Sequence, residues 1–149
     1  MNDEVISVVT DFSIMLAKWP EQAELLRKLR ESVFVIEQGV DAAIEWDGKD
    51  NLCQHLIAFS ADNQPIATGR MLPDGHIGRI AVIPSWRGKG VGAAILENLI
   101  ALARNADAEM VYLNSQTHAL AFYQRFSFIA EGEVYMEAGI PHQRMTLKF

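Results

Sequence analysis

Apolar positions along the chain form short alternating or continuous runs separated by helical stretches. Residues 4–12 are rich in β-branched side chains and predict a first strand. Pro20, which suits the first turn of a helix, precedes apolar residues at helical spacing, so we predict a helix over residues 20–37. Residues 38–51 show no clear period and indicate a loop. The remaining pattern predicts strands over 53–60, 65–72, 76–83, 110–115, 128–136 and 144–149, and helices over 90–106 and 117–126.

The order of these elements indicates an α/β (α+β) fold with one mixed, mostly antiparallel sheet flanked by helices. The helix over 90–106 connects the strands over 76–83 and 110–115, which predicts that these two strands run parallel through a right-handed crossover. The 149 residues are close to the usual size of one domain, and no Pro/Gly/Ser linker divides them. We therefore expect a single domain over residues 1–149.

The clearest chemical signal lies between the strand over 76–83 and the helix that follows it. Residues 87–92 read RGKGVG, and three glycines in five residues let the backbone approach a ligand closely. Free N–H groups at the start of the helix, together with the helix dipole, favour an anion there. Arg87 and Lys89 add positive charge beside these groups. This segment therefore indicates a phosphate or pyrophosphate site.

Two common phosphate-binding motifs do not fit this segment. A Walker A loop requires Ser or Thr after its lysine, whereas Gly90 follows Lys89, and Ile83 stands where its first glycine should be. The dinucleotide fingerprint is met literally by Gly88, Gly90 and Ala93. However, the next strand ends in Asn-Ser-Gln and lacks the acid that would bind a ribose. A different phosphate-bearing ligand is therefore favoured.

Charge is distributed unevenly along the chain. The net charge is −6 and the sequence pI is about 5.1, which argues against general nucleic-acid binding. Residues 64–96 nevertheless hold four basic residues and one acid, so this part of the chain has a net charge of +3. The acidic run over residues 45–50 is expected to be a solvated loop, or to favour a cationic amine if it borders a substrate cleft.

Metal and membrane sites are not indicated. The four histidines lack the spacing of metal ligands, and one cysteine, Cys53, allows neither an internal disulfide nor a cysteine-based zinc site. No apolar run approaches 18 residues, and the N-terminus does not resemble a signal peptide. We therefore expect no metal, no membrane association and a cytoplasmic location.

Three segments together resemble one family. The R-x-x-G-x-G pattern that begins at Arg87, preceded by an aliphatic V-x-P, resembles the acetyl-CoA loop of the GNAT superfamily of N-acetyltransferases. Residues 121–128, AFYQRFSF, resemble the A-x-x-F-Y segment of the same superfamily, although Ser127 replaces its usual glycine. VFVIEQ over residues 33–38 and EAGIPH over residues 137–142 are similar to its small ElaA-like branch.

The resemblance implies where acetyl-CoA would bind. The pantetheine arm would lie along the strand at residues 80–82, and the pyrophosphate would rest on the amides of residues 88–92. The thioester would reach a gap where the strands over 77–83 and 110–115 splay apart. The implied cofactor-binding residues are Ile80, Ala81, Val82, Arg87, Gly88, Lys89, Gly90, Val91, Gly92, Asn114, Gln116 and Tyr123. Asn114 and Gln116 are alternatives for one contact, since many relatives carry an asparagine seven residues before the tyrosine.

Tyr123 is the expected catalytic acid, because the reference pKa of a phenol, about 10, lies close enough to that of a thiol for it to protonate the coenzyme A thiolate. The catalytic base is less defined. The positions at which relatives carry a glutamate are Ile77, Gly78 or Arg79 on one strand and Val111 on another. The remaining candidates are Glu37, His76, Glu137 and His142, or a chain of water molecules.

The resemblance therefore implies an acetyl-CoA-dependent N-acetyltransferase. Its acceptor would be a primary amine of a small molecule or peptide, which attacks the thioester directly. The alternative is a non-catalytic acyl-CoA-binding or regulatory module on the same fold, favoured by the missing glutamate. No residue pattern identifies the acceptor, and the C-terminal strands would supply an edge through which a homodimer could form.

Overall fold

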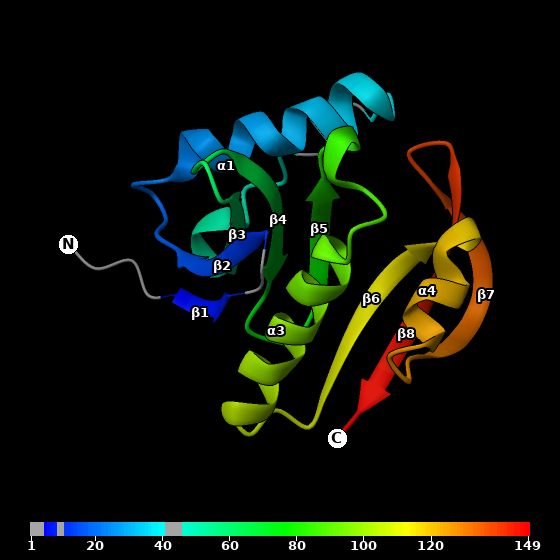
Figure 1. Cartoon of the computed structure of the whole chain (residues 1–149). Coiled ribbons are helices and arrows are strands. Elements are labelled where there is room, and N and C mark those ends of the chain that lie inside the picture. The colour runs from blue at the N-terminus through cyan, green and yellow to red at the C-terminus, as the bar shows by residue number, and fades with distance from the viewer. Residues whose placement is uncertain (1–4, 9–10, 41–45) are drawn as a thin grey trace.

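A computed structural model describes residues 5–8, 11–40 and 46–149. Two antiparallel sheets make up most of it (Figure 1). The first sheet has the order β1 (Val5–Val8), β2 (Phe12–Ala17), β3 (Gln54–Ser60), β4 (Pro65–Met71) and β5 (Ile77–Val82). The second has the order β6 (Met110–Gln116), β8 (Ile140–Lys148) and β7 (Ile129–Glu137). Helical segments are α1 (Ala23–Arg30), η1 (Glu31–Glu37), η2 (Asp50–Leu52), η3 (Pro84–Trp86), α3 (Val91–Asn105), η4 (Thr117–Ala119) and α4 (Leu120–Gln124).

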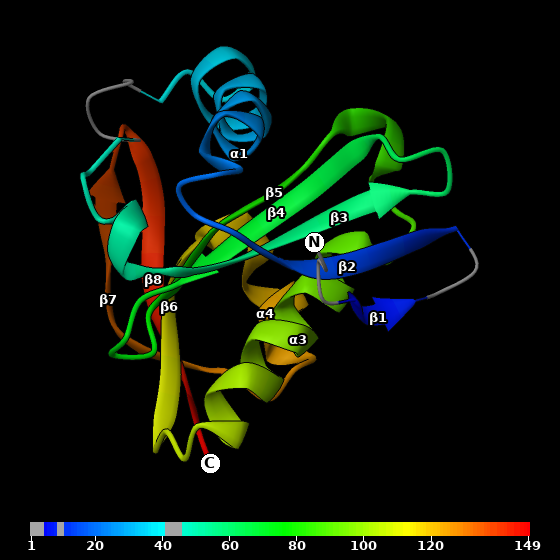
Figure 2. The same ribbon diagram turned by 90° about the vertical axis from the view of Figure 1, so that its left-hand side faces the viewer.

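The first sheet is covered on both faces (Figure 2). Leu56 and Ala58 of β3 join a buried cluster with Ile95 and Leu99 of α3. Ile57, between them, packs instead against Leu26 and Leu29 of α1. Because successive side chains of a strand point to opposite faces, α1 and α3 lie on opposite sides of this sheet. Burial on both faces explains why β3 reads as a continuous apolar run.

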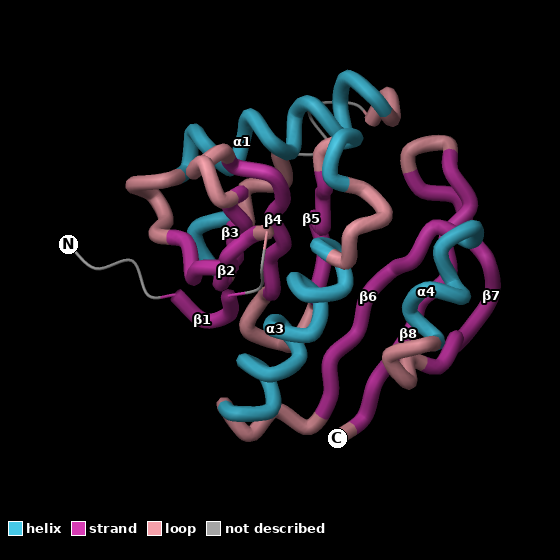
Figure 3. Tube along the Cα trace, viewed as in Figure 1, coloured by secondary structure: helices cyan, strands magenta, loops and turns pink. Residues whose placement is uncertain are grey.

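Among the described residues, one isolated bridge joins the two sheets. A parallel bridge joins His76, just before β5, to Tyr112 of β6, and the Tyr112 amide donates to the Gly75 carbonyl over 3.0 Å. Beyond this bridge β5 and β6 diverge (Figure 3). Gly75 suits the junction, since its φ is +92° and a Cβ there would lie 2.6 Å from the Met110 carbonyl oxygen. The predicted fold class and the splay between the two strands are confirmed. The predicted parallel pairing of the strands over 76–83 and 110–115 is limited to the bridge between His76 and Tyr112.

Several predicted element boundaries were wrong. The strand over 4–12 is replaced by two strands, β1 and β2, with residues 4, 9 and 10 outside the described ranges. The helix over 20–37 begins three residues late and ends in the π-helical η1, and the helix over 117–126 is a 3₁₀ turn followed by α4. None of the helices in the described ranges has the length and apolar character needed to span a membrane.

The largest correction concerns the start of β8. The sequence predicts a turn through residues 137–142, but only Ala138 and Gly139 form it, with φ values of +52° and +75°. Positive φ at both central residues is typical of a two-residue hairpin. Pro141 is tolerated because it lies one residue beyond the last pair between β6 and β8. His142 therefore belongs to a strand.

Candidate active site

A cavity of about 270 Å³ occupies the gap between the diverging strands. Its walls come from β5 and β6, from η1, from α4 and from the β7–β8 hairpin. A wider hollow of about 710 Å³ adjoins it and reaches Arg87. Both are lined by Gln38, Ile80, Gln116, Ala119 and Ile140. One continuous groove therefore leads from the glycine-rich segment to the point where the strands splay.

The loop over residues 87–92 has the backbone geometry that its glycines suggested. Gly88 and Gly90 have φ values of +76° and +82°, and Gly90 is the N-cap of α3. No side chain of the described residues caps this helix, and its first turn contains no acid. The first N–H groups of α3 therefore lack intrahelical partners. An anionic group such as a pyrophosphate fits this end of the helix. Because Gly88, Gly90 and Gly92 lack a Cβ, such a group can approach the backbone closely.

Arg87 is engaged at the mouth of the wider hollow. Its Nη1 and Nη2 atoms donate to the two carboxylate oxygens of Glu37 over 2.5 and 2.6 Å, and its Nε donates to the Val82 carbonyl over 2.9 Å. The hydrogen bonds from Arg87 lower the pKa of Glu37. The two side chains are 41% and 40% exposed, so this pair lies in solvent. Lys89 lies over the Trp86 ring, with its Nζ 4.8 Å from the ring centroid.

The strand proposed for the pantetheine arm is the last of its sheet. Ile80, Ala81 and Val82 lie in β5, which pairs with β4 along one edge. At its other edge, the bridge to β6 lies before β5, at His76. Its other edge faces the gap, and an edge strand presents unpaired backbone groups. An extended ligand can pair with such an edge as an additional strand.

A β-bulge interrupts β5 beside the cavity. Thr68 of β4 pairs with Ala81, whereas Arg70 pairs with Gly78, so two residues of β5 stand opposite one of β4. Arg79, one of the two, has a φ of +52°. A bulge leaves its extra residue out of the ladder and re-aims the backbone. No residue pattern predicts this bulge, since neither bulged residue is a glycine.

Tyr123 of α4 lines the cavity. Its ring packs edge-on against Phe122 and Phe128. Burial raises the pKa of Tyr123, so its phenol stays protonated at neutral pH. Within the described ranges no residue forms a hydrogen bond with its hydroxyl group. The tyrosine thus presents a proton to the cavity.

Asn114 and Gln116, the two alternatives on β6, also line the cavity. The Gln116 Nε2 donates to Oε1 of Gln38 over 3.2 Å, which links β6 to the end of η1. The structure brings both amides to the same wall, and their contacts with a cofactor stay a prediction.

The four candidate bases lie in different surroundings. Glu37 is paired with Arg87, whereas His76, Glu137 and His142 line the cavity. The His76 ring stacks on Tyr112, with centroids 4.7 Å apart. Burial lowers the pKa of His76; the charge of Asp74 raises it, and the charges of Arg70, Arg79 and Lys49 lower it, so that the pKa is lowered overall.

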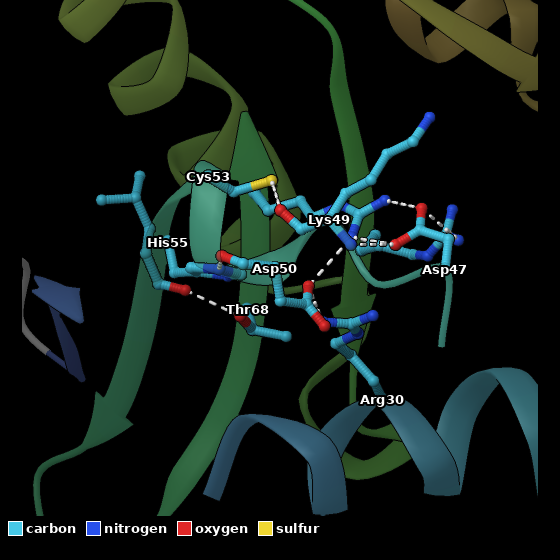
Figure 4. A network of polar contacts seen from close by, with 10 residues as sticks. Arg30, Asp47, Lys49, Asp50, Cys53, His55 and Thr68 are labelled. Atoms are coloured by element: carbon cyan, nitrogen blue, oxygen red, sulfur yellow. Dashed lines mark hydrogen bonds and ion pairs between the residues drawn. The ribbon is translucent and has the colours of Figure 1, made fainter. Parts of the chain in front are cut away.

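A buried network of ions beside the cavity was missed by sequence reasoning (Figure 4). We call its five members, Arg30, Asp47, Asp50, Arg70 and Arg79, the inner ion network. Asp50 accepts from Arg30 over 2.7 Å and from Arg70 over 2.8 Å, while Asp47 accepts from Arg70 over 2.5 Å and is 3.3 Å from Arg79. Burial raises the pKa of both aspartates, but the arginine hydrogen bonds and charges outweigh it and lower each pKa overall.

The inner ion network corrects two expectations. Asp47 and Asp50 are partners of buried arginines and do not form a solvated loop, while Glu45 lies outside the described residues. Arg70 and Arg79, which contribute to the positive segment over 64–96, face these aspartates, and Arg87 faces Glu37. The net charge of that segment is therefore largely offset by acids from elsewhere in the chain. No local spacing signals this, because the partners are 20 to 50 residues apart.

Metal ligands are not gathered in the part of the chain that the structure describes. No group of three or more His, Cys, Asp or Glu side chains there is placed to hold an ion.

Comparisons with known proteins agree with this geometry. Residues 26–149 match the acetyltransferase (GNAT) domain. YjcF of Bacillus subtilis, described as an uncharacterised N-acetyltransferase, is 35% identical over 135 residues, which cover 88% of this chain and 96% of that protein. An acyl-CoA N-acyltransferase from Pseudomonas aeruginosa has a similar structure, with a TM-score of 0.77 and 34% identity over 91% of this chain and 97% of that one.

ElaA of Escherichia coli is also structurally similar, with a TM-score of 0.79 and 30% identity over 92% of this chain and 99% of that chain. A GNAT acetyltransferase from Elizabethkingia anophelis, solved with acetyl-CoA bound, shares the fold at 20% identity, with a TM-score of 0.67 over 95% and 100% of the two chains. The family match covers most of the chain, and the predicted resemblance is confirmed. The chain therefore belongs to the GNAT family of acetyltransferases and is an enzyme of acyl transfer.

Proposed function

We propose that this protein transfers an acetyl group from acetyl-CoA to a primary amine of a small molecule or peptide. The observation that carries this proposal is the continuous groove from the loop over residues 87–92 to the cavity that contains Tyr123. A long thioester with a phosphate-bearing end fits such a groove. The acetyl-CoA in the structure of the Elizabethkingia anophelis protein supports the choice of acyl donor.

In the proposed complex, the pyrophosphate rests on the amides at the start of α3. The pantetheine arm pairs with the edge of β5 that faces the gap at residues 80–82, where it would take the place of Arg87 Nε at the Val82 carbonyl, and Asn114 or Gln116 holds it from β6. The acetyl group then lies beside the bulge at Arg79. The thioester oxygen, where negative charge develops during attack, would then lie near the backbone of this bulge.

The proposed reaction is direct attack of a neutral amine on the thioester carbonyl. The C–N bond forms, the C–S bond breaks, and the electron pair of that bond leaves with sulfur. Tyr123 donates its phenolic proton to the departing thiolate, for which its raised pKa keeps the proton available. No covalent enzyme intermediate is required.

The test measures thiol release from acetyl-CoA with a panel of amines. We expect turnover with at least one amine, and a loss of about 10² to 10⁴-fold in kcat for Tyr123→Phe. Arg87→Ala should reduce the thermal shift caused by acetyl-CoA. The matched control is Arg104→Ala, since Arg104 lies over the Phe149 ring far along α3 from the loop.

The alternative function is a non-catalytic acyl-CoA-binding module, which the absence of glutamate at Ile77, Gly78, Arg79 and Val111 favours. It predicts a thermal shift with acetyl-CoA, no turnover with any amine, and no kinetic effect of Tyr123→Phe. That combination would overturn the proposed catalytic function.

A further inference from the structure

The β7–β8 hairpin brings a histidine and a glutamate to the cavity. The two-residue turn places Glu137 opposite Ile140, and His142 follows two residues later on the same face of β8. The Nδ1 of His142 lies 2.7 Å from the Ile140 carbonyl oxygen. A carbonyl oxygen can only accept a hydrogen bond, so in the neutral ring Nδ1 would carry the proton and Nε2 the free electron pair. Nε2 lies 3.7 Å from a carboxylate oxygen of Glu137.

His142 and Tyr123 approach the cavity from opposite faces of the second sheet. His142 pairs directly with Gln116 of β6, so these two side chains share one face. Tyr123 packs against the buried cluster that contains Leu113 and Met145, which occupy the other face. Both His142 and Tyr123 line the 270 Å³ cavity. An amine and a thioester that meet in this cavity would therefore have one titratable group on each side.

The other candidate bases are less suited to accept a proton. Both carboxylate oxygens of Glu37 receive hydrogen bonds from Arg87. His76 is buried against Tyr112 and faces the positive charges of Arg70, Arg79 and Lys49, which disfavour an imidazolium. Its nearest acid, Asp74, already accepts a hydrogen bond from the Tyr112 hydroxyl over 2.5 Å.

We propose that His142 is the general base of the reaction and that Glu137 stabilises its protonated form. This inference rests on the proposed function. As the C–N bond forms, the proton on the amine nitrogen passes to Nε2 of His142, and the Glu137 carboxylate offsets the positive charge that appears there. Tyr123 gives its proton to the sulfur. Solvent then removes one proton from His142 and returns one to Tyr123, which restores both groups.

Several charged or titratable groups face His142. Glu137 and Tyr135 lie on β7, and the Tyr135 ring stacks on the histidine with centroids 6.0 Å apart. Arg144 lies two residues further along β8, with its guanidinium held 4.2 Å from the centroid of the Tyr112 ring. His76, Arg79 and Tyr123 face it across the cavity. Glu137 is the acid that lies within ion-pair distance of the ring among these groups.

The first experiment measures the pH profile of kcat/KM for an accepted amine at saturating acetyl-CoA. In His142→Gln we expect kcat/KM to fall by about 10² to 10⁴-fold and the acidic limb of the profile to disappear. The thermal shift with acetyl-CoA should persist, which shows that the cofactor site is intact. In His76→Gln the acidic limb should remain. An unchanged acidic limb in His142→Gln, or its loss in His76→Gln alone, would overturn the assignment.

The second experiment uses Glu137→Gln, which changes a half-exposed side chain and keeps its size. Without the carboxylate the imidazolium is less stable, so the acidic limb should move to lower pH. Added imidazole should also restore part of the rate of His142→Ala. If the acidic limb of the kcat/KM profile did not move in Glu137→Gln, the role of this residue would be contradicted. This test holds even if His142→Gln fails to fold. Turnover that depends on Tyr123 with no effect at His142 would overturn the base alone, whereas no turnover in the native protein would overturn the function and the base together.

Discussion

Two sets of arginine–carboxylate contacts lie near the groove and differ in their exposure to solvent. In the inner ion network Arg30, Asp50 and Arg70 are buried and the Arg79–Asp47 contact is about a quarter exposed, whereas Arg87 and Glu37 form a half-exposed pair at the groove mouth. Buried charges lose their hydration and depend on one another, so removing one carboxylate leaves buried positive charge less well compensated. An exposed pair can exchange its carboxylate for water or for another anion. Arginine–carboxylate pairs therefore stabilise the fold in the inner ion network, whereas the exposed pair of Arg87 and Glu37 can be exchanged for contacts with a ligand.

Removing Asp50 should have the largest effect, because its carboxylate binds two buried arginines. We expect Asp50→Ala to lower the free energy of unfolding by about 3–5 kcal/mol. Urea denaturation measures this value. Glu97→Ala removes a carboxylate from the exposed surface of α3 and serves as the control. If Asp50→Ala lowered the free energy of unfolding as little as the control does, the inner ion network would not stabilise the fold.

A conservative change of Arg70 should lower the free energy of unfolding less than Asp50→Ala does. Arg70 donates to both aspartates, and a lysine keeps the charge but lacks the planar fork that reaches two partners. We expect Arg70→Lys to lower the free energy of unfolding by about 1–3 kcal/mol. If Arg70→Lys were as stable as the native protein, charge alone and not geometry would account for the network.

Acid should weaken the inner ion network before it weakens the rest of the core. The arginines hold the pKa of Asp47 and of Asp50 below the unfolded value of 3.8. Their contribution to stability is thus complete above about pH 4 and declines as the pH falls further, by up to about 1.4 kcal/mol per pH unit for each carboxyl. Stability measured against pH should fall less steeply below pH 4 in Asp47→Asn. Equal slopes for the two proteins would contradict the assignment.

The exposed pair should give the smallest effect on stability and a distinct effect on binding. Glu37→Gln should leave the thermal midpoint unchanged, because the pair is solvated. It removes a competitor for Arg87, so acetyl-CoA should bind about two- to fivefold more tightly in calorimetry. Glu31→Gln, on the same helical segment, is the matched control. Weaker binding in Glu37→Gln would instead show that Glu37 orients Arg87 for its ligand.

Local sequence patterns sufficed for the frame of the site. The glycine loop, the strand before it and the helix after it are adjacent in sequence, so their geometry follows from spacing and turn chemistry. Contacts between distant segments were not predictable in this way. The partners in the inner ion network are far apart in the chain. Residues 137–142, EAGIPH, contain both Gly and Pro, so the pattern predicts a longer turn than the two-residue turn of the hairpin. The roles of the cofactor-binding residues and of Tyr123 stay predictions.

The position of β8 between β6 and β7 has a consequence for folding during synthesis. β8 follows both of its partners in the chain, and β6 and β7 do not pair with each other. Neither strand can form its ladder until β8 has left the ribosome, whereas the first sheet is complete once β5 has emerged. Until then the edges of β6 and β7 that pair with β8 keep unpaired backbone groups, and a chain stalled after β7 would expose these edges to chaperones or to aggregation.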